Sequence, residues 1–176
     1  MKLRGFEVAK GFNPDEINLP KRATTNAAGY DFEASSDIVI PSMLNTEVSE
    51  LIKLWEENES ETTQAEIKKK LKPVLVPTGV KAYMGENEVL QLANRSGNPL
   101  KAHIYLANGI GVIDGDYYEN ESNDGHIMFQ FINLGYSDYV IRKGDRIGQG
   151  VFMPFLISDN DDVTTIRTGG FGSSGK

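Results

Sequence analysis

Four short segments of this 176-residue chain combine residue types that could bind an anion or activate water. They are Ala28–Asp31, Asn94–Pro99, Asn108–Tyr117 and Arg142–Gly150. The second places Arg95, Ser96 and Gly97 in one turn, where a guanidinium fork, a hydroxyl and a backbone amide could surround an anion. An ordinary Asn/Gly/Pro turn with an exposed arginine has the same composition, so this segment alone is a weak signal.

The third segment brings a carboxylate, Asp114, to the end of an apolar run that glycines flank. We expect a β-hairpin here, whose backbone N–H and C=O groups could meet the edge of a flat base. Asp114 is then a candidate general base, and Tyr117 could lie flat against a sugar. A plain hairpin with acidic turn residues is the alternative. A calcium site at Asp114 and Asp116 is less favoured, because the loop lacks further oxygen ligands.

The other two segments and the C-terminal tail are ambiguous when each is taken alone. Asp31 could cap backbone amides in a turn before a strand. Gln149 follows a basic turn and could donate an amide hydrogen to a phosphate oxygen, or it could lie on a solvated turn. The tail over 167–176 is glycine-rich, which is typical of a flexible terminus or a cloning remnant. Phe171 argues against a linker, since an aromatic ring among glycines suits a segment that closes over a site.

Short apolar runs bounded by turn residues dominate the rest of the chain. Examples are Asp37–Pro41, Val74–Val80, Glu88–Leu92, Ala102–Leu106, Ile127–Ile132 and Val151–Phe155. Their lengths and boundaries predict many short strands, and therefore an all-β sandwich or barrel. We treat residues 1–176 as a single domain, because this length is sufficient for one core and short for two.

The segment Met43–Lys72 breaks this pattern and predicts a helical insertion between two strands. Apolar residues recur there at spacings of four, three and four, which places them on one helical face. These residues are Leu44, Val48, Leu51 and Trp55. Asn45 is a candidate N-cap, and Thr63 and Glu66 have capping-box spacing, so two helices could form. The alternative is a charged, solvated excursion that only packs on the barrel.

Composition and charge exclude several classes of site. The chain has no cysteine and two histidines, which excludes disulfide frameworks, thiolate metal sites and any site of three imidazoles. A formal net charge of −7 argues against long nucleic acid as the main ligand. No apolar run approaches the roughly 20 residues of a membrane span, and the N-terminus lacks a signal-peptide core. We therefore expect a soluble, cytoplasmic protein.

The order of these segments resembles the trimeric dUTPase (dUTP pyrophosphatase) family, which has five short motifs in this sequence order. The matching segments are Ala28–Asp31, Arg95–Gly97, Gly111–Tyr117, Gly144–Gln149 and Gly169–Gly175. The third and fifth are the specific ones. The resemblance spans about residues 22–176 apart from the insertion, and Val76–Gly79 also resembles the family's lead-in to its next strand.

The resemblance implies a jelly-roll-like barrel with the helical insertion over 43–72 and a flexible closing arm over 159–176. It implies a homotrimer with active sites at subunit boundaries. The implied reaction is Mg²⁺-dependent hydrolysis of dUTP to dUMP and pyrophosphate, which limits uracil incorporation into DNA and supplies dUMP for dTMP synthesis. A dCTP deaminase shares the fold, but it fits the third and fifth motifs less well.

The resemblance also implies a role for each matching residue. Asp114 matches the catalytic aspartate that activates a water molecule. The implied phosphate contacts are Arg95, Ser96, Gly97, Gln149, Arg167, Gly172 and Ser173. The implied uracil contacts are Asn108 and the backbone of Gly111, Val112 and Ile113. Tyr117 would pack on the deoxyribose and Phe171 on the uracil ring. Asp31 would reach Mg²⁺ through water, while the phosphates hold the ion.

Four features depart from the family pattern. Asn94 stands where the family usually has glycine or proline, and Gly148 replaces the usual alanine, which we expect to be a minor change. The residues Tyr118–Gly125 extend the third motif. Arg167 lies four residues before Phe171, whereas many members have five.

The insertion suggests an alternative function of a different class. It resembles extra segments in dUTPases of temperate phages of Gram-positive bacteria, some of which bind a repressor. The alternative is therefore a nucleotide-gated regulatory protein that binds a repressor-type partner through 43–72, with or without catalysis.

Overall fold

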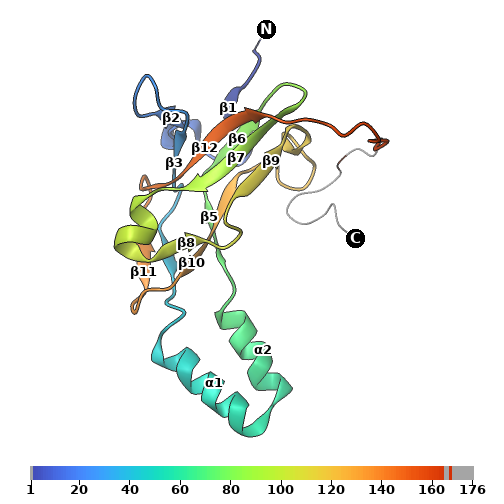
Figure 1. Cartoon of the computed structure of the whole chain (residues 1–176). Coiled ribbons are helices and arrows are strands. Elements are labelled where there is room, and N and C mark those ends of the chain that lie inside the picture. The colour runs from blue at the N-terminus through green and yellow to red at the C-terminus, as the bar shows by residue number, and fades with distance from the viewer. Residues whose placement is uncertain (1, 165–166, 168–176) are drawn as a thin grey trace.

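The computed structural model describes residues 2–164 and Arg167, and this part of the chain is built mainly from short strands (Figure 1). The strands are β1 (Gly5–Val8), β2 (Lys21–Arg22), β3 (Tyr30–Glu33), β4 (Ile38–Ile40), β5 (Val74–Pro77), β6 (Val80–Tyr83), β7 (Glu88–Asn94), β8 (Ile104–Leu106), β9 (Gly111–Asp114), β10 (Met128–Asn133), β11 (Tyr139–Ile141) and β12 (Arg146–Pro154). Two α-helices, α1 (Thr46–Asn58) and α2 (Glu61–Lys70), lie between β4 and β5. The predicted all-β fold with a helical insertion is confirmed.

Antiparallel pairing organises the strands around one apolar core. The largest sheet has the order β2-β3-β12-β7-β9, and a second has the order β5-β10-β8. Two further pairs, β1-β6 and β4-β11, complete the barrel-like body. The largest fully buried side chains include Phe32, Leu90, Ile104, Phe129 and Phe131, which come from both larger sheets. No helix in the described ranges is long and apolar enough to cross a membrane.

Glycines in the long central strand β12 make room for the aromatic core. A Cβ at Gly148 would lie 2.0 Å from Cε1 of Phe129, and one at Gly150 would lie 2.8 Å from Cε2 of Phe32. Phe129 in turn stacks on Phe131, with ring centroids 6.1 Å apart. The absence of a methyl group at Gly148 is therefore coupled to the ring at Phe129.

The insertion forms a helical hairpin that projects from one end of the barrel (Figure 1). The Asn45 side chain accepts a hydrogen bond from the Val48 amide at 2.9 Å, so the predicted N-cap is confirmed. Of the predicted apolar face, Val48 is buried and Leu51 is half-buried. Leu44 lies before the helix and is 51% exposed, so it is not part of this face.

The second helix does not begin at the predicted capping box. Helix α2 starts at Glu61 after Ser60, so Thr63 already lies inside its first turn. The reason is the connection: α1 ends at Asn58, and Glu59 with a left-handed φ of 47° reverses the chain at once. The short connection leaves no residues for a cap at Thr63.

Candidate functional site

The first group of site residues lies where β3, β12 and β7 run side by side; we call it the donor cluster. It consists of Asp31, Arg95, Ser96, Gly97, Arg146 and Gln149. In the sheet register Gln149 lies opposite both Asp31 and Ala93, which brings three sequence-distant segments together. The Asp31 carboxylate forms an ion pair with the Arg146 guanidinium, with Oδ2 and Nη1 3.1 Å apart. Arg146 was missed as a site residue, although it lies within the fourth motif.

The turn after β7 is fixed to the start of β12 by polar side chains. The Arg95 guanidinium donates to the Arg146 carbonyl oxygen at 3.0 Å. Asn98 donates to the Ile147 carbonyl oxygen and to the Asn94 side-chain oxygen, both at 2.8 Å. Asn94 also donates to the Ile104 carbonyl oxygen at 3.0 Å. Asn94, the departure from the family pattern, thus has a structural role in anchoring this turn.

A close fit between Gly29 and Gln149 joins the first motif to the fourth. A Cβ at Gly29 would lie 2.2 Å from Oε1 of Gln149, so only glycine leaves space for this carboxamide. The Gln149 amide nitrogen lies 3.5 Å from the Asn94 carbonyl oxygen. At Gly97, by contrast, a Cβ would meet no described atom within 4 Å. That position is open to approach by a ligand.

The second group of site residues lies at the far end of β9; we call it the aspartate cluster. It consists of Asp114, Asp116, Tyr117 and Arg167. The Arg167 guanidinium contacts a carboxylate oxygen of Asp114, and its Nε lies 2.9 Å from Asp116 Oδ1. It also lies over the Tyr117 ring, 5.8 Å from the centroid. The predicted arm residue Arg167 is therefore brought to the predicted catalytic aspartate. Phe171, Gly172 and Ser173 lie outside the described residues.

A small pocket of about 140 Å³ lies beside β9. The predicted base-reading residues Asn108, Gly111, Val112 and Ile113 all line it, together with Leu92, Leu106, Met128, Phe129 and Gln130. Because β9 is the last strand of its sheet, one row of its backbone N–H and C=O groups does not face β7. These groups are the ones suited to reading a flat heterocycle.

The expected β-hairpin around this pocket does not form. β8 pairs with β10, whereas β9 pairs with β7, so the two strands belong to different sheets. The loop between them contains Gly109, whose φ of +70° suits glycine. Divergence of the two strands is what opens the pocket, since residues from both line it.

The two clusters are far apart within one chain. Asp114 lies opposite Val89 near one end of β7, and Arg95 follows the other end. At about 3.4 Å per residue, the six residues from 89 to 95 span about 20 Å along the strand. This separation along the strand is long for one phosphate chain to bridge within a single copy of the protein.

The described residues contain no group of three or more histidine, aspartate or glutamate side chains that could hold a metal ion by themselves. Asp31 is the carboxylate of the donor cluster and is only partly exposed. A single carboxylate fits an ion such as Mg²⁺ that keeps several waters and binds substrate phosphates, and it does not fit an all-protein cage.

Comparison with known proteins decides the family. The dUTPase family model matches residues 60–175. The chain is 43% identical over 177 aligned positions to the deoxyuridine 5'-triphosphate nucleotidohydrolase of Lactococcus lactis, covering 99% of each chain. The chain belongs to the dUTPase family. A Desulfitobacterium hafniense dUTPase is 36% identical, with 89% of this chain and 87% of that protein covered.

Solved dUTPase structures share this fold. The crystal structure of the Streptococcus mutans dUTPase matches with a TM-score of 0.69 and 41% identity, covering 88% of this chain and 98% of that one. The dUTPase of phage phi11 of Staphylococcus aureus matches with a TM-score of 0.63 at 16% identity, covering 96% of this chain and 100% of that one. At that identity the phage likeness supports the fold alone. The family expected from the five ordered motifs is confirmed.

Proposed function

We propose that this protein hydrolyses dUTP to dUMP and pyrophosphate. The observation that carries the proposal is the position of Asp114 at the end of edge strand β9, next to a base-sized pocket. The membership in the dUTPase family supports the same reaction.

Uracil is selected at the pocket beside β9. Backbone groups of Gly111–Ile113 and the Asn108 side chain form hydrogen bonds with the edge of the base. Because Phe129, Leu92 and Leu106 form the apolar wall, the base leaves water when it enters, which strengthens these hydrogen bonds. We expect selection against thymine to be steric, because the β9 backbone would approach the base edge too closely to admit its methyl group.

Asp114 is the general base. Its carboxylate orients a water molecule, removes a proton from it and directs it at the α-phosphorus, so that pyrophosphate leaves. General-base catalysis of this kind contributes roughly 10²–10⁴-fold. Tyr117 packs against the deoxyribose. Burial raises the pKa of its hydroxyl, so the ring stays neutral over the working pH range.

The donor cluster holds the phosphate chain. Arg95, Gln149 and the Ser96–Gly97 turn direct guanidinium, amide and hydroxyl hydrogens at phosphate oxygens, where they stabilise charge that develops in the transition state. Mg²⁺, which a dUTPase of phage phi11 coordinates as a structural ion, would neutralise phosphate charge when bound, with Asp31 reaching it through water. Arg167 and the arm residues Phe171, Gly172 and Ser173 close the site.

A homotrimer completes the site. Ring assembly joins different surfaces of neighbouring copies, so each copy places its donor cluster next to the aspartate cluster of its neighbour. This arrangement accounts for the separation of about 20 Å along β7 between the two clusters of one chain.

The test is direct turnover. The protein is mixed with Mg²⁺ and dUTP, and dUMP and pyrophosphate are measured. Asp114→Asn should lower kcat by roughly 10²–10⁴-fold. The matched control is Asp37→Asn, because Asp37 is also paired with an arginine, Arg142, but lies outside both clusters. Full activity in Asp114→Asn, or ammonia release from dCTP in place of dUTP hydrolysis, would contradict the proposal.

The regulatory alternative is not favoured by the comparisons, and a repressor-type partner of the insertion stays a prediction. Deleting 43–72 should leave dUTP hydrolysis nearly unchanged, since both clusters lie on other elements. If hydrolysis were lost while the trimer survived, the insertion would belong to the active site.

A further inference from the structure

The ring proposed to face the deoxyribose, Tyr117, is held from the loop that follows it. Its hydroxyl donates to the His126 carbonyl oxygen at 3.0 Å and accepts from the Asn123 side-chain amide at 2.7 Å. Its own carbonyl oxygen accepts from the Asn120 side-chain amide at 2.8 Å. The hydroxyl and the backbone carbonyl of Tyr117 are thus both hydrogen-bonded to the segment Tyr118–Gly125 or to His126, which follows it. This segment is the extension that departs from the family pattern.

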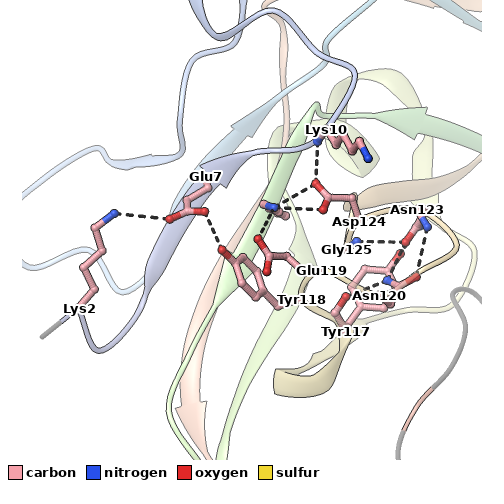
Figure 2. Close-up of polar contacts among 11 residues, drawn as sticks. Lys2, Glu7, Lys10, Tyr117, Tyr118, Glu119, Asn120, Asn123, Asp124 and Gly125 are labelled. Carbon is pink, nitrogen blue, oxygen red and sulfur yellow. Dashed lines mark hydrogen bonds and ion pairs between the residues drawn. The ribbon is translucent and has the colours of Figure 1, made fainter.

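The orientation of the Asn123 carboxamide is fixed by its other partners. Its oxygen accepts from the Asn120 amide at 2.8 Å and from the Gly125 backbone N–H at 3.2 Å (Figure 2). The oxygen is therefore committed to donors within the loop, and the NH₂ group must face the Tyr117 hydroxyl. Asn120 is 8% exposed, and its oxygen accepts from the backbone and hydroxyl of Ser122. The loop has a polar interior built around two asparagines.

The backbone of this loop adopts conformations that need outside support. Glu119 and Asp124 have left-handed φ values of 55° and 59°, which non-glycine residues seldom adopt. Gly125 has a φ of 77°, and a Cβ there would lie 2.7 Å from the Tyr117 carbonyl oxygen. A loop with these features keeps its shape only where surrounding contacts impose it.

A buried lysine of strand β6 supplies that support. The Lys81 side chain is 8% exposed, and its Nζ lies 3.0 Å from both Glu119 Oε1 and Asp124 Oδ2. One ammonium group therefore holds the two non-glycine residues with left-handed backbone. Burial lowers the pKa of Lys81, but the hydrogen bonds to Asp124 and Glu119 outweigh it and raise that pKa, so the group stays charged.

Neighbouring residues of β1 and of the following turn fix the same loop from outside. The Lys10 backbone N–H donates to Asp124 at 2.7 Å. The Tyr118 hydroxyl donates to Glu7 at 2.7 Å (Figure 2). The centroid of its ring lies 4.8 Å from Lys81 Nζ. The loop is thus tied to two strands of the barrel body and not only to its own ends.

We propose that the extension Tyr118–Gly125 is a positioning loop that sets the sugar specificity of the enzyme. Asn123 fixes the Tyr117 ring against the 2'-carbon of the deoxyribose, and Lys81 holds the loop that presents Asn123. The inference rests on the proposed function, because it requires a 2'-deoxyribonucleotide beside Tyr117. A ring held in place leaves no room for a 2'-hydroxyl, whereas a ring free to shift admits one.

The test compares kcat and KM for dUTP and for UTP. In Asn123→Ala, the KM for dUTP should rise about tenfold with kcat nearly unchanged, because the ring contacts the sugar and not the reacting phosphorus. Because a ring free to shift admits the 2'-hydroxyl, kcat/KM for UTP should rise, so the dUTP/UTP ratio of kcat/KM should fall by at least about tenfold. Lys81→Met should also lower the dUTP/UTP ratio of kcat/KM. Lys81→Arg, which keeps the positive charge, should have a ratio close to that of the unaltered protein. Lys70→Met is the control, since Lys70 pairs with Glu47 in the insertion.

A double-mutant cycle separates positioning from general loosening of the fold. If Asn123 acts through the Tyr117 hydroxyl, Tyr117→Phe should lower the ratio similarly, and the double variant should be no worse than either single one. Additive losses, or an unchanged ratio in Asn123→Ala, would overturn the inference. Failure of the unaltered protein to hydrolyse dUTP would instead overturn the proposed function, so the two failures are distinguishable.

Discussion

The separation of the two clusters predicts that inactive chains can rescue each other. Asp114→Asn disables the aspartate cluster, and Arg95→Ala disables the donor cluster. Each variant alone should be nearly inactive, with losses of roughly 10²–10⁴-fold from the general base and roughly 10²–10³-fold from a phosphate donor. If a site takes one cluster from each of two neighbours, a mixed trimer regains a site wherever an intact Asp114 faces an intact Arg95.

The size of the rescue follows from ring geometry. In any mixed trimer of the two variants, one neighbouring pair is in the productive order, whichever chain is in the majority. Mixed trimers should therefore have about one third of the specific activity of the unaltered protein. Compared with a parent variant whose specific activity is reduced 10²-fold, the mixed trimers should be about thirtyfold more active.

The assay uses co-expression of the two variants with different affinity tags, followed by purification on both tags. Activity is measured as pyrophosphate release from dUTP. The control is a mixed trimer of two differently tagged Asp114→Asn chains, which should stay inactive. Mixed trimers of the two variants that are no more active than their parents would refute the reasoning, since both clusters of one chain would then serve the same site.

Three further predictions concern the fold. Gly148→Ala should lower the free energy of unfolding by about 1–3 kcal/mol in urea titration, because the new methyl group meets the Phe129 ring, and Phe129→Leu should relieve part of the loss. Asn45→Ala should lower the stability of the helical hairpin by about 1 kcal/mol, because the N-cap hydrogen bond is lost. Unfolding followed by the fluorescence of the single tryptophan, which lies in α1, measures this loss, and dUTP turnover should be unchanged. Burial lowers the pKa of His126, whose Nε2 accepts from the Gly79 N–H at 2.9 Å. The neutral His126 side chain therefore stabilises the folded protein above the ordinary histidine pKa of about 6.5, and this contribution is lost as the pH falls below that value. On acidification, the Tm of the unaltered protein should fall more steeply than the Tm of His126→Gln. Parallel Tm curves would contradict this.

The features that could be predicted from sequence are those encoded within a few neighbouring residues. Apolar runs of strand length gave the all-β class, and the spacing of Val48 and Leu51 gave a helix in the insertion. Gly111, Val112 and Ile113, which were predicted to read the base, line one pocket together because they are consecutive residues of β9. Short-range patterns of this kind do not depend on how the chain folds back on itself.

The features that sequence did not reveal depend on long-range pairing. The segment around Asn108 has the composition of a hairpin, but whether β8 and β9 pair is decided by β10 and β7. The ion pair between Asp31 and Arg146 joins residues 115 positions apart, and nothing local to either predicts it. Lys81 reads as an ordinary strand lysine, and only the folded chain shows that it is buried against two carboxylates.

The charges of the two clusters explain how a chain of net charge −7 can take a triphosphate. The donor cluster has two guanidinium groups against one carboxylate, so its local charge favours phosphate. In the aspartate cluster, Arg167 pairs with Asp114 and Asp116 and neutralises part of their charge, so it also occupies the carboxylate that we propose as the general base. In the proposed mechanism, Arg167 exchanges carboxylate oxygens for phosphate oxygens when a neighbour presents a phosphate chain here. Because the guanidinium would keep anionic partners throughout, we expect this exchange to release Asp114 for its water without leaving an unpaired charge in a partly buried site.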